Sequence, residues 1–132
     1  MIRRFMHRRP HLTPRQCLFA LLTCGWAAAI AWGSLTPADT LPRDLPWDKL
    51  NHFIAYGGLA IGLGLSGCRR GTALIAAVAF GAAIEFLQIP VPGRHGGDPA
   101  DLLANGLGAL SGILLGLGVA AFRERHPQRH RQ

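Results

Sequence analysis

Four long apolar stretches, separated by short polar segments, dominate the pattern of the chain. They cover residues 17–35, 50–68, 72–91 and 102–122, and each is 19 to 21 residues long. The hydrocarbon core of a bilayer is about 30 Å thick, which a helix crosses in about 20 residues. A soluble domain of 132 residues has no need of four such stretches. The pattern therefore predicts four transmembrane helices, and with them an all-α integral membrane four-helix bundle.

Signals at the ends of the stretches support this division. Thr13 precedes Pro14, and Asp98 precedes Pro99, so two helices are expected to start with a polar cap followed by a proline. Pro37 is expected to end the first helix.

Two further local patterns concern turns and packing. Residues 69–71 predict a tight turn between the second and third helices. Gly108, Gly112 and Gly116 recur every four residues on the last helix, which predicts a face for close helix packing. Such a face is also compatible with a homo-oligomer.

The positions of the charged residues say more about the topology of the chain than its composition does. Hydrophobic residues make up 49% of the chain and charged residues 16%, yet the net charge is +7. Eleven of the fourteen Lys and Arg residues lie before the first stretch, between the second and third, or after the last. By the positive-inside rule this predicts cytoplasmic termini and outer loops at residues 36–49 and 92–101. Because topology explains the positive charge, no nucleic-acid partner is expected.

The predicted organisation has three parts: a basic cytoplasmic segment (residues 1–16), the transmembrane domain (17–122) and a basic cytoplasmic tail (123–132). The expected location is the inner (plasma) membrane, where the basic ends contact anionic lipids. The first stretch is longer than the apolar region of a signal peptide, which favours an uncleaved anchor. Cys17, Cys24 and Cys68 are expected to be free thiols.

Polar side chains that are costly in lipid gather at one depth of the predicted bundle. Glu85 is the only ionisable residue deep inside an apolar stretch. A buried acid in a membrane is expected to face the bundle interior and to have a partner. Polar residues from three helices converge in the outer third, which predicts a binding site there. The set is Asp48, His52, Tyr56, Glu85, Gln88, Arg94, Asp101 and Asn105.

These residues also stand in a characteristic order. The chain reads Asp48-Lys49-x-x-His52-Phe53-x-x-Tyr56, Glu85-x-x-Gln88, Gly93-Arg94 and Asp101-x-x-x-Asn105-x-x-Gly108-x-x-x-Gly112. Over about residues 15–122 it resembles the VanZ-like family of small bacterial membrane proteins. The resemblance implies that the family's polar signature falls on the eight residues above. It also implies a context, glycopeptide (teicoplanin) resistance or another cell-envelope function, but no reaction.

One stretch, residues 96–99, departs from the family pattern, so no role is assigned to His95 or Asp98.

One interpretation of the cluster is a binding site for an envelope precursor or a glycopeptide. Arg94 is then expected to bind a phosphate or carboxylate through two parallel hydrogen bonds. His52, Gln88 and Asn105 supply directional hydrogen bonds, and Trp47 anchors the rim at the outer interface. Membrane lipids are the other expected partners.

A second interpretation is an enzyme acting on a lipid-linked substrate, with His52 and Glu85 as the catalytic candidates. His52 is the general base, oriented by Asp48 or Glu85. No Ser, Cys or Thr is expected beside this group, and Tyr56 is the only hydroxyl that fits. Metal binding through His52, Glu85 and Asp101 matches no known ligand spacing, so neither a metal nor a cofactor is expected.

A third interpretation is purely structural. In that case Glu85 pairs with Arg94, or accepts hydrogen bonds from His52 and Tyr56, and the network fixes the helices relative to one another. Whether the protein is an enzyme stays open among these three.

Overall fold

The computed structural model describes residues 12–40 and 48–125. These residues form four α-helices, α1 (Pro14–Leu35), α2 (Asp48–Leu65), α3 (Arg70–Gln88) and α4 (Pro99–Arg125), and a short 3-10 helix, η1 (Ala38–Thr40). The all-α prediction is confirmed. Trp47, the predicted rim residue, and the greater part of the predicted basic segments 1–16 and 123–132 lie outside the described residues.

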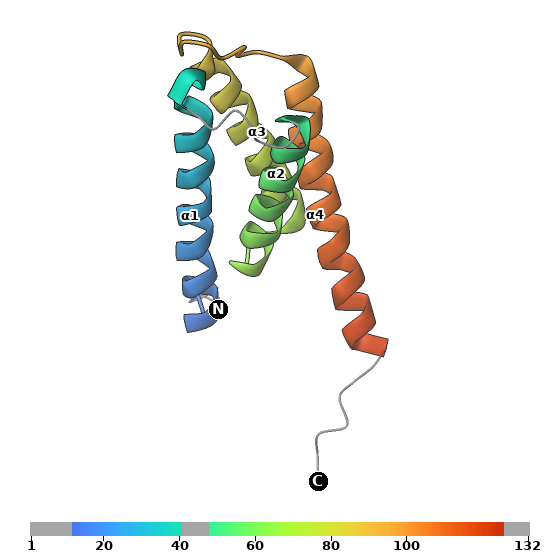
Figure 1. Cartoon of the computed structure of the whole chain (residues 1–132). Coiled ribbons are helices and arrows are strands. Elements are labelled where there is room, and N and C mark those ends of the chain that lie inside the picture. Colours follow the sequence, from blue (N-terminus) through green and yellow to red (C-terminus); the bar gives the residue numbers. More distant parts are fainter. Residues whose placement is uncertain (1–11, 41–47, 126–132) are drawn as a thin grey trace, which may run out of the picture.

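Successive helices run in opposite directions (Figure 1). The C-terminal ends of α1 and α3 therefore lie beside the N-terminal ends of α2 and α4. This end of the bundle is called the polar end below. The start of α1 and the end of α4 both lie at the opposite end, on different sides of the bundle (Figure 1).

The predicted helix starts are both present. The Thr13 hydroxyl accepts a hydrogen bond from the Gln16 backbone N–H, and Gln16 Oε1 accepts one from the Thr13 backbone N–H. This reciprocal arrangement satisfies two donors that the first turn of a helix leaves free. At α4, Asp98 Oδ1 accepts from the Ala100 N–H at 2.8 Å. The sequence therefore fixes where α1 and α4 begin.

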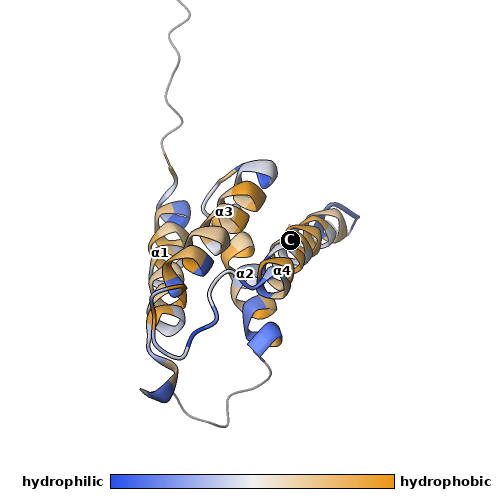
Figure 2. Ribbon diagram, turned by 90° about the horizontal axis from the view of Figure 1, so that it is seen from above, coloured by the Kyte–Doolittle hydropathy of each residue, from blue (hydrophilic) through white to orange (hydrophobic). Residues whose placement is uncertain are grey.

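Three of the four helices, α1, α3 and α4, are long and apolar enough to cross a membrane. Most of their residues are hydrophobic (Figure 2). Large apolar side chains such as Trp32 (79% exposed) and Phe86 (71%) are left uncovered. Exposed apolar surface on this scale belongs in lipid rather than in water. The chain is thus a membrane protein. α2 is less apolar than the other three helices, because four of its first five residues are polar.

α2 occupies the centre of the bundle and contacts each of the other three helices. Its closest neighbour is α4. A Cβ on Gly108 would collide with the backbone of Phe53, and one on Gly112 with the carbonyl oxygen of Gly57. The predicted packing face is therefore present at Gly108 and Gly112. It does not extend to Gly116, where a Cβ would meet nothing within 4 Å.

The turn between α2 and α3 lies earlier than predicted. Gly67 has a φ of +94°, a left-handed conformation that glycine adopts without strain. α3 already begins at Arg70, with Arg69 as its N-cap. The prediction of a turn at residues 69–71 is wrong because Gly67, rather than Gly71, reverses the chain.

Candidate functional site

The start of α2 carries the polar face that the sequence predicts. Asp48, His52 and Tyr56 are spaced by four residues, so a helix of about 3.6 residues per turn aligns them along one face. All three line one cavity of about 260 Å³ between α1 and α2. His52 and Tyr56 are buried, whereas Asp48 in the first turn is exposed. The face thus descends from the polar end into the bundle.

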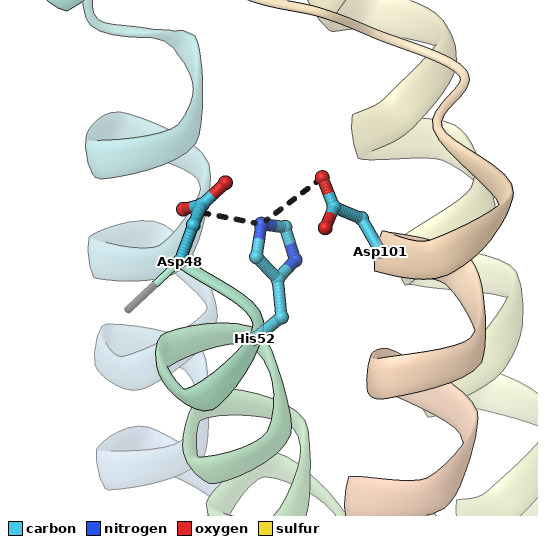
Figure 3. A group of neighbouring side chains, drawn as sticks. All are labelled: Asp48, His52 and Asp101. Carbon is cyan, nitrogen blue, oxygen red and sulfur yellow. Dashed lines mark ion pairs between the residues drawn. The ribbon is translucent and has the colours of Figure 1, made fainter. Parts of the chain in front are cut away.

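His52 lies between two carboxylates, one on its own helix and one on α4 (Figure 3). Its Nε2 atom is 3.9 Å from Asp48 Oδ1 and 3.9 Å from Asp101 Oδ2. Both separations are too long for a hydrogen bond. On the other side of the ring, Nδ1 is 2.9 Å from Asn105 Oδ1. An amide oxygen can only accept, so Nδ1 donates its proton to Asn105 and Nε2 faces the two carboxylates.

These residues also have the arrangement of metal ligands. Asp48, His52 and Asp101 each offer one ligand atom, and these atoms all lie within 4.8 Å of one another. Two of the residues come from α2 and the third from α4. A search for short ligand motifs cannot find such a set, because the helices bring it together only in three dimensions.

Lys49 links the starts of α2 and α4. Its ammonium group donates hydrogen bonds to Asp101 Oδ1 and, at 2.8 Å, to Asp98 Oδ2. The bonds to Asp101 and Asp98 raise the pKa of Lys49 above its usual range. The bond from Lys49 lowers the pKa of Asp98 in turn. Lys49 therefore balances part of the acidic charge at the polar end, although the sequence predicts no site role for it.

Glu85 is almost fully buried, with 1% of its surface exposed. Its Oε2 atom accepts a hydrogen bond from the backbone N–H of Gly97 at 3.1 Å, while Oε1 has no partner among the described residues. The loop can approach so closely because Gly96 has no side chain. A Cβ at this position would lie only 2.6 Å from the Glu85 carbonyl oxygen and would collide with it. Its partner is thus a loop amide. An ion pair between Glu85 and Arg94 is not found in the described part of the chain.

Arg94 and Gln88 hold the end of α1. Arg94 Nε donates to the carbonyl of Thr36 at 3.0 Å, and a second nitrogen of its guanidinium donates to Gly33. Gln88 Nε2 donates to the carbonyl of Ser34 at 2.8 Å. The last turn of a helix leaves its carbonyls without partners, and these side chains satisfy three of them. Two of the five Arg94 donor hydrogens are therefore already engaged.

The cavity combines polar and apolar walls. Tyr56, whose hydroxyl is buried and has no partner among the described residues, contributes to the wall formed by α2. Ala29, Ile30 and Ala55 line it with apolar groups. Ser34 of α1 is also in the lining, which corrects the expectation that no Ser, Cys or Thr lies beside the polar cluster. A mixed lining of this kind suits an amphipathic ligand.

Of the eight predicted residues, all except Glu85 line the cavity or contact His52. The seven are Asp48, His52, Tyr56, Gln88, Arg94, Asp101 and Asn105. Arg94 lines the cavity but also caps α1, and Glu85 is bound by the loop.

Sequence reasoning missed Lys49, Gly97, Asp98 and Ser34 as parts of the site. One signal was available for Lys49, which is the only lysine of the chain and stands next to Asp48 at the edge of an apolar stretch. The sequence pattern identifies Asp98 as a helix cap but does not predict its ion pair with Lys49. The roles of Gly97 and Ser34 depend on how the loop and α1 pack, which the sequence pattern does not contain.

Comparison with known proteins supports the order of motifs seen in the sequence. No curated protein and no solved structure gives a significant match to the chain. A family model described as VanZ/LLP1 matches residues 3–120, which is almost the whole length. The match includes all four helices up to the last residues of α4, and every residue of the polar cluster. The chain belongs to the VanZ/LLP1 family.

Proposed function

We propose that the protein binds the polar head group of a lipid-linked cell-envelope precursor in the cavity between α1 and α2. The observation that carries this proposal is the Tyr56 hydroxyl. It belongs to a side chain with 1% of its surface exposed, it has no partner among the described residues, and its residue lines the cavity. A buried polar group without a hydrogen bond costs about 1–3 kcal/mol, and a bound ligand removes that cost.

The walls support an amphipathic ligand. Asp48, His52 and Gln88 present polar groups, and Ala29 and Ile30 of α1 present apolar ones. A head group with hydroxyl or amide groups satisfies the polar side, while the attached lipid chain stays beside the apolar one.

The size of the cavity favours a head group over a whole glycopeptide. Sites for drug-sized ligands have volumes of about 300–1,000 Å³. The cavity measures about 260 Å³, so it suits a smaller group. In this proposal, glycopeptide susceptibility changes because the protein binds the precursor, not because it binds the antibiotic.

The route of entry follows from the packing of α1. Only Thr23 and Ile30 of this helix are buried, and α1 contacts α2 and α3 but not α4. A lipid can therefore reach the cavity from the membrane beside α1. The distribution of basic residues supports a polar end that faces outward, where envelope precursors are used.

The test compares lipids that copurify with wild-type protein and with Tyr56→Phe, measured by mass spectrometry after extraction in mild detergent. Ser66→Ala is the matched control, because it also removes one hydroxyl. Ser66 follows the end of α2 and donates to the carbonyl of Gly62, outside the cavity. A precursor lost only from Tyr56→Phe supports the proposal. Equal amounts of precursor in all three proteins, or none in any, contradict it.

Two other functions are outcomes of the same experiment. If purified wild-type protein converts the copurified lipid and His52→Ala does not, the site is an enzyme with His52 as the base. If Tyr56→Phe lowers thermal stability and no lipid copurifies, the polar cluster is structural.

A further inference from the structure

The strongest unassigned feature of the polar end is the space between His52 and the two carboxylates of Asp48 and Asp101 (Figure 3). We propose that these three residues bind one divalent transition-metal cation, with Zn²⁺ the best match. The proposal goes beyond the binding of a precursor, because Zn²⁺ binding can be tested without any lipid and its outcome does not depend on the proposed function.

The first argument comes from the histidine. His52 is 9% exposed, and its Nδ1 donates to Asn105 Oδ1 at 2.9 Å. A histidine that binds a metal usually donates its other ring N–H to an oxygen acceptor in this manner, which aims the lone pair of the coordinating nitrogen. Here that lone pair belongs to Nε2. Among residues 12–40 and 48–125, Nε2 has no hydrogen-bond partner, and it points to the carboxylates.

The second argument is that the two carboxylate oxygens of Asp101 have different partners. This carboxylate is buried, and its Oδ1 is bound by Lys49, while Oδ2 faces His52 Nε2. The Lys49 bond fixes the orientation of the group and leaves one oxygen for a second cation. A lone pair that faces two carboxylate oxygens at 3.9 Å is otherwise unfavourable, because all three atoms are negative or electron-rich.

The third argument is geometric. Zn²⁺ lies about 2.0–2.2 Å from nitrogen and carboxylate oxygen, so two ligand atoms in a tetrahedral site are about 3.4 Å apart. The distances from Nε2 to both carboxylates are 3.9 Å. Each of these two distances must shorten by about half an ångström. The ligand oxygens of Asp48 and Asp101, which lie within 4.8 Å of each other, must approach by up to about 1.4 Å. Asp48, whose side chain is 62% exposed, supplies most of this movement.

The fourth argument is charge. Lys49 binds two carboxylates, those of Asp98 and Asp101, and a third carboxylate, that of Asp48, lies beside His52. With neutral His52 this leaves two uncompensated negative charges, which one divalent cation neutralises. One imidazole and two carboxylates form a mixed set of ligands, which suits Zn²⁺ and other transition metals better than Mg²⁺ or Ca²⁺. The fourth position of the metal stays free for water.

The test titrates chelator-treated protein, in detergent, with Zn²⁺ alone and follows binding by calorimetry. The background protein has no histidine tag. The four histidines near its ends are replaced by alanine, because exposed histidines would bind metal on their own. They are His7, His11, His126 and His130. We expect about one Zn²⁺ per chain. Co²⁺ is titrated in parallel, and the absence of a thiolate band in its spectrum shows that Cys17, Cys24 and Cys68 do not bind it.

Variants separate the metal site from other causes. His52→Ala and Asp101→Asn are expected to abolish stoichiometric binding, and Asp48→Asn to weaken it at least tenfold. Asp48 is exposed, so its variant keeps the test valid if a buried substitution prevents folding. Asn105→Leu is expected to lower affinity about 10–100-fold, whereas Asn105→Asp, which still accepts from Nδ1, retains it.

Three results would overturn the proposal. The first is binding of less than about 0.2 equivalents of Zn²⁺ by the background protein, which is roughly the error of such a titration. The others are unchanged binding in Asp48→Asn and His52→Ala, or a cobalt spectrum with a thiolate band. Each is distinct from a failure of the proposed function. Tyr56→Phe keeps all three ligands, so it is expected to lose the lipid and bind Zn²⁺ normally.

Discussion

The backbone of Gly108 in α4 lies directly against the carbonyl group of Phe53 in α2, with no room for a side-chain atom between them. The contact brings α4 close enough for Asn105, one turn earlier, to reach His52. The position of the polar cluster therefore depends on a glycine that carries no chemistry itself.

A methyl group at position 108 separates the two helices. Gly108→Ala is expected to destabilise the protein by about 1–3 kcal/mol, the usual cost of overpacking, even though alanine favours a helix. Thermal unfolding in detergent measures the change. The matched control is Gly116→Ala, whose added Cβ meets nothing within 4 Å. Equal unfolding temperatures for the two variants would show that the close approach at Gly108 is unimportant.

The buried acid on α3 gives a second prediction. Glu85→Gln keeps an oxygen that accepts from the Gly97 N–H, so it is expected to accumulate in the membrane like the wild type. Glu85→Leu leaves that amide without its partner and is expected to cost about 1–3 kcal/mol. Immunoblots of membrane fractions and unfolding temperatures test both. The idea fails if Glu85→Leu is as stable as Glu85→Gln.

The cap on α1 gives a third prediction. Arg94→Ala removes donors to the carbonyls of Thr36 and Gly33, so the last turn of α1 is expected to exchange its amide hydrogens faster. Hydrogen–deuterium exchange over residues 30–36 measures this. Arg123→Ala, an arginine in the last turn of α4, is the control and should leave α1 unchanged. Protection that persists in Arg94→Ala would assign the arginine to the cavity alone.

Orientation gives a fourth prediction. In a background without the three native cysteines, Asp39→Cys near the polar end is expected to react in intact cells with a maleimide that cannot cross membranes. Arg70→Cys at the opposite end is expected to react only after the cells are opened. Both positions are exposed, so burial does not explain a difference. Labelling of Arg70→Cys from outside would reverse the predicted topology.

Much of this fold can be read from the sequence, because helix starts and apolar faces are local properties. Thr13 and Asp98 cap α1 and α4 through neighbours no more than three residues away. The spacing of Asp48, His52 and Tyr56 fixes a common face of α2 for the same reason. The depth at which the polar residues gather was also predictable, since it follows from their distance to the helix ends.

The partners of these residues were less predictable, because they depend on which helix lies beside which face. Arg94 was expected to serve a ligand or Glu85, and it caps α1, whose end happens to lie next to the loop before α4. Glu85 finds its partner in a loop amide. The loop comes close because Gly96 has no side chain, and Gly97 adopts a left-handed backbone with a φ of +79°. The sequence pattern places Lys49 in a loop, since nothing in its neighbours predicts its contacts with Asp98, just before α4, and Asp101 of α4.

The polar start of α2 also affects how this helix enters the membrane during synthesis. Charged residues such as Asp48 and Lys49 oppose the release of an isolated helix from the translocation channel into lipid. α1, α3 and α4 are apolar enough to be released alone, whereas α2 is not. We therefore expect its insertion to depend on helices that arrive after it, above all on α4, whose Asp101 pairs with Lys49. The same bond that shapes the polar end is thus expected to couple the integration of the second helix to the synthesis of the last one.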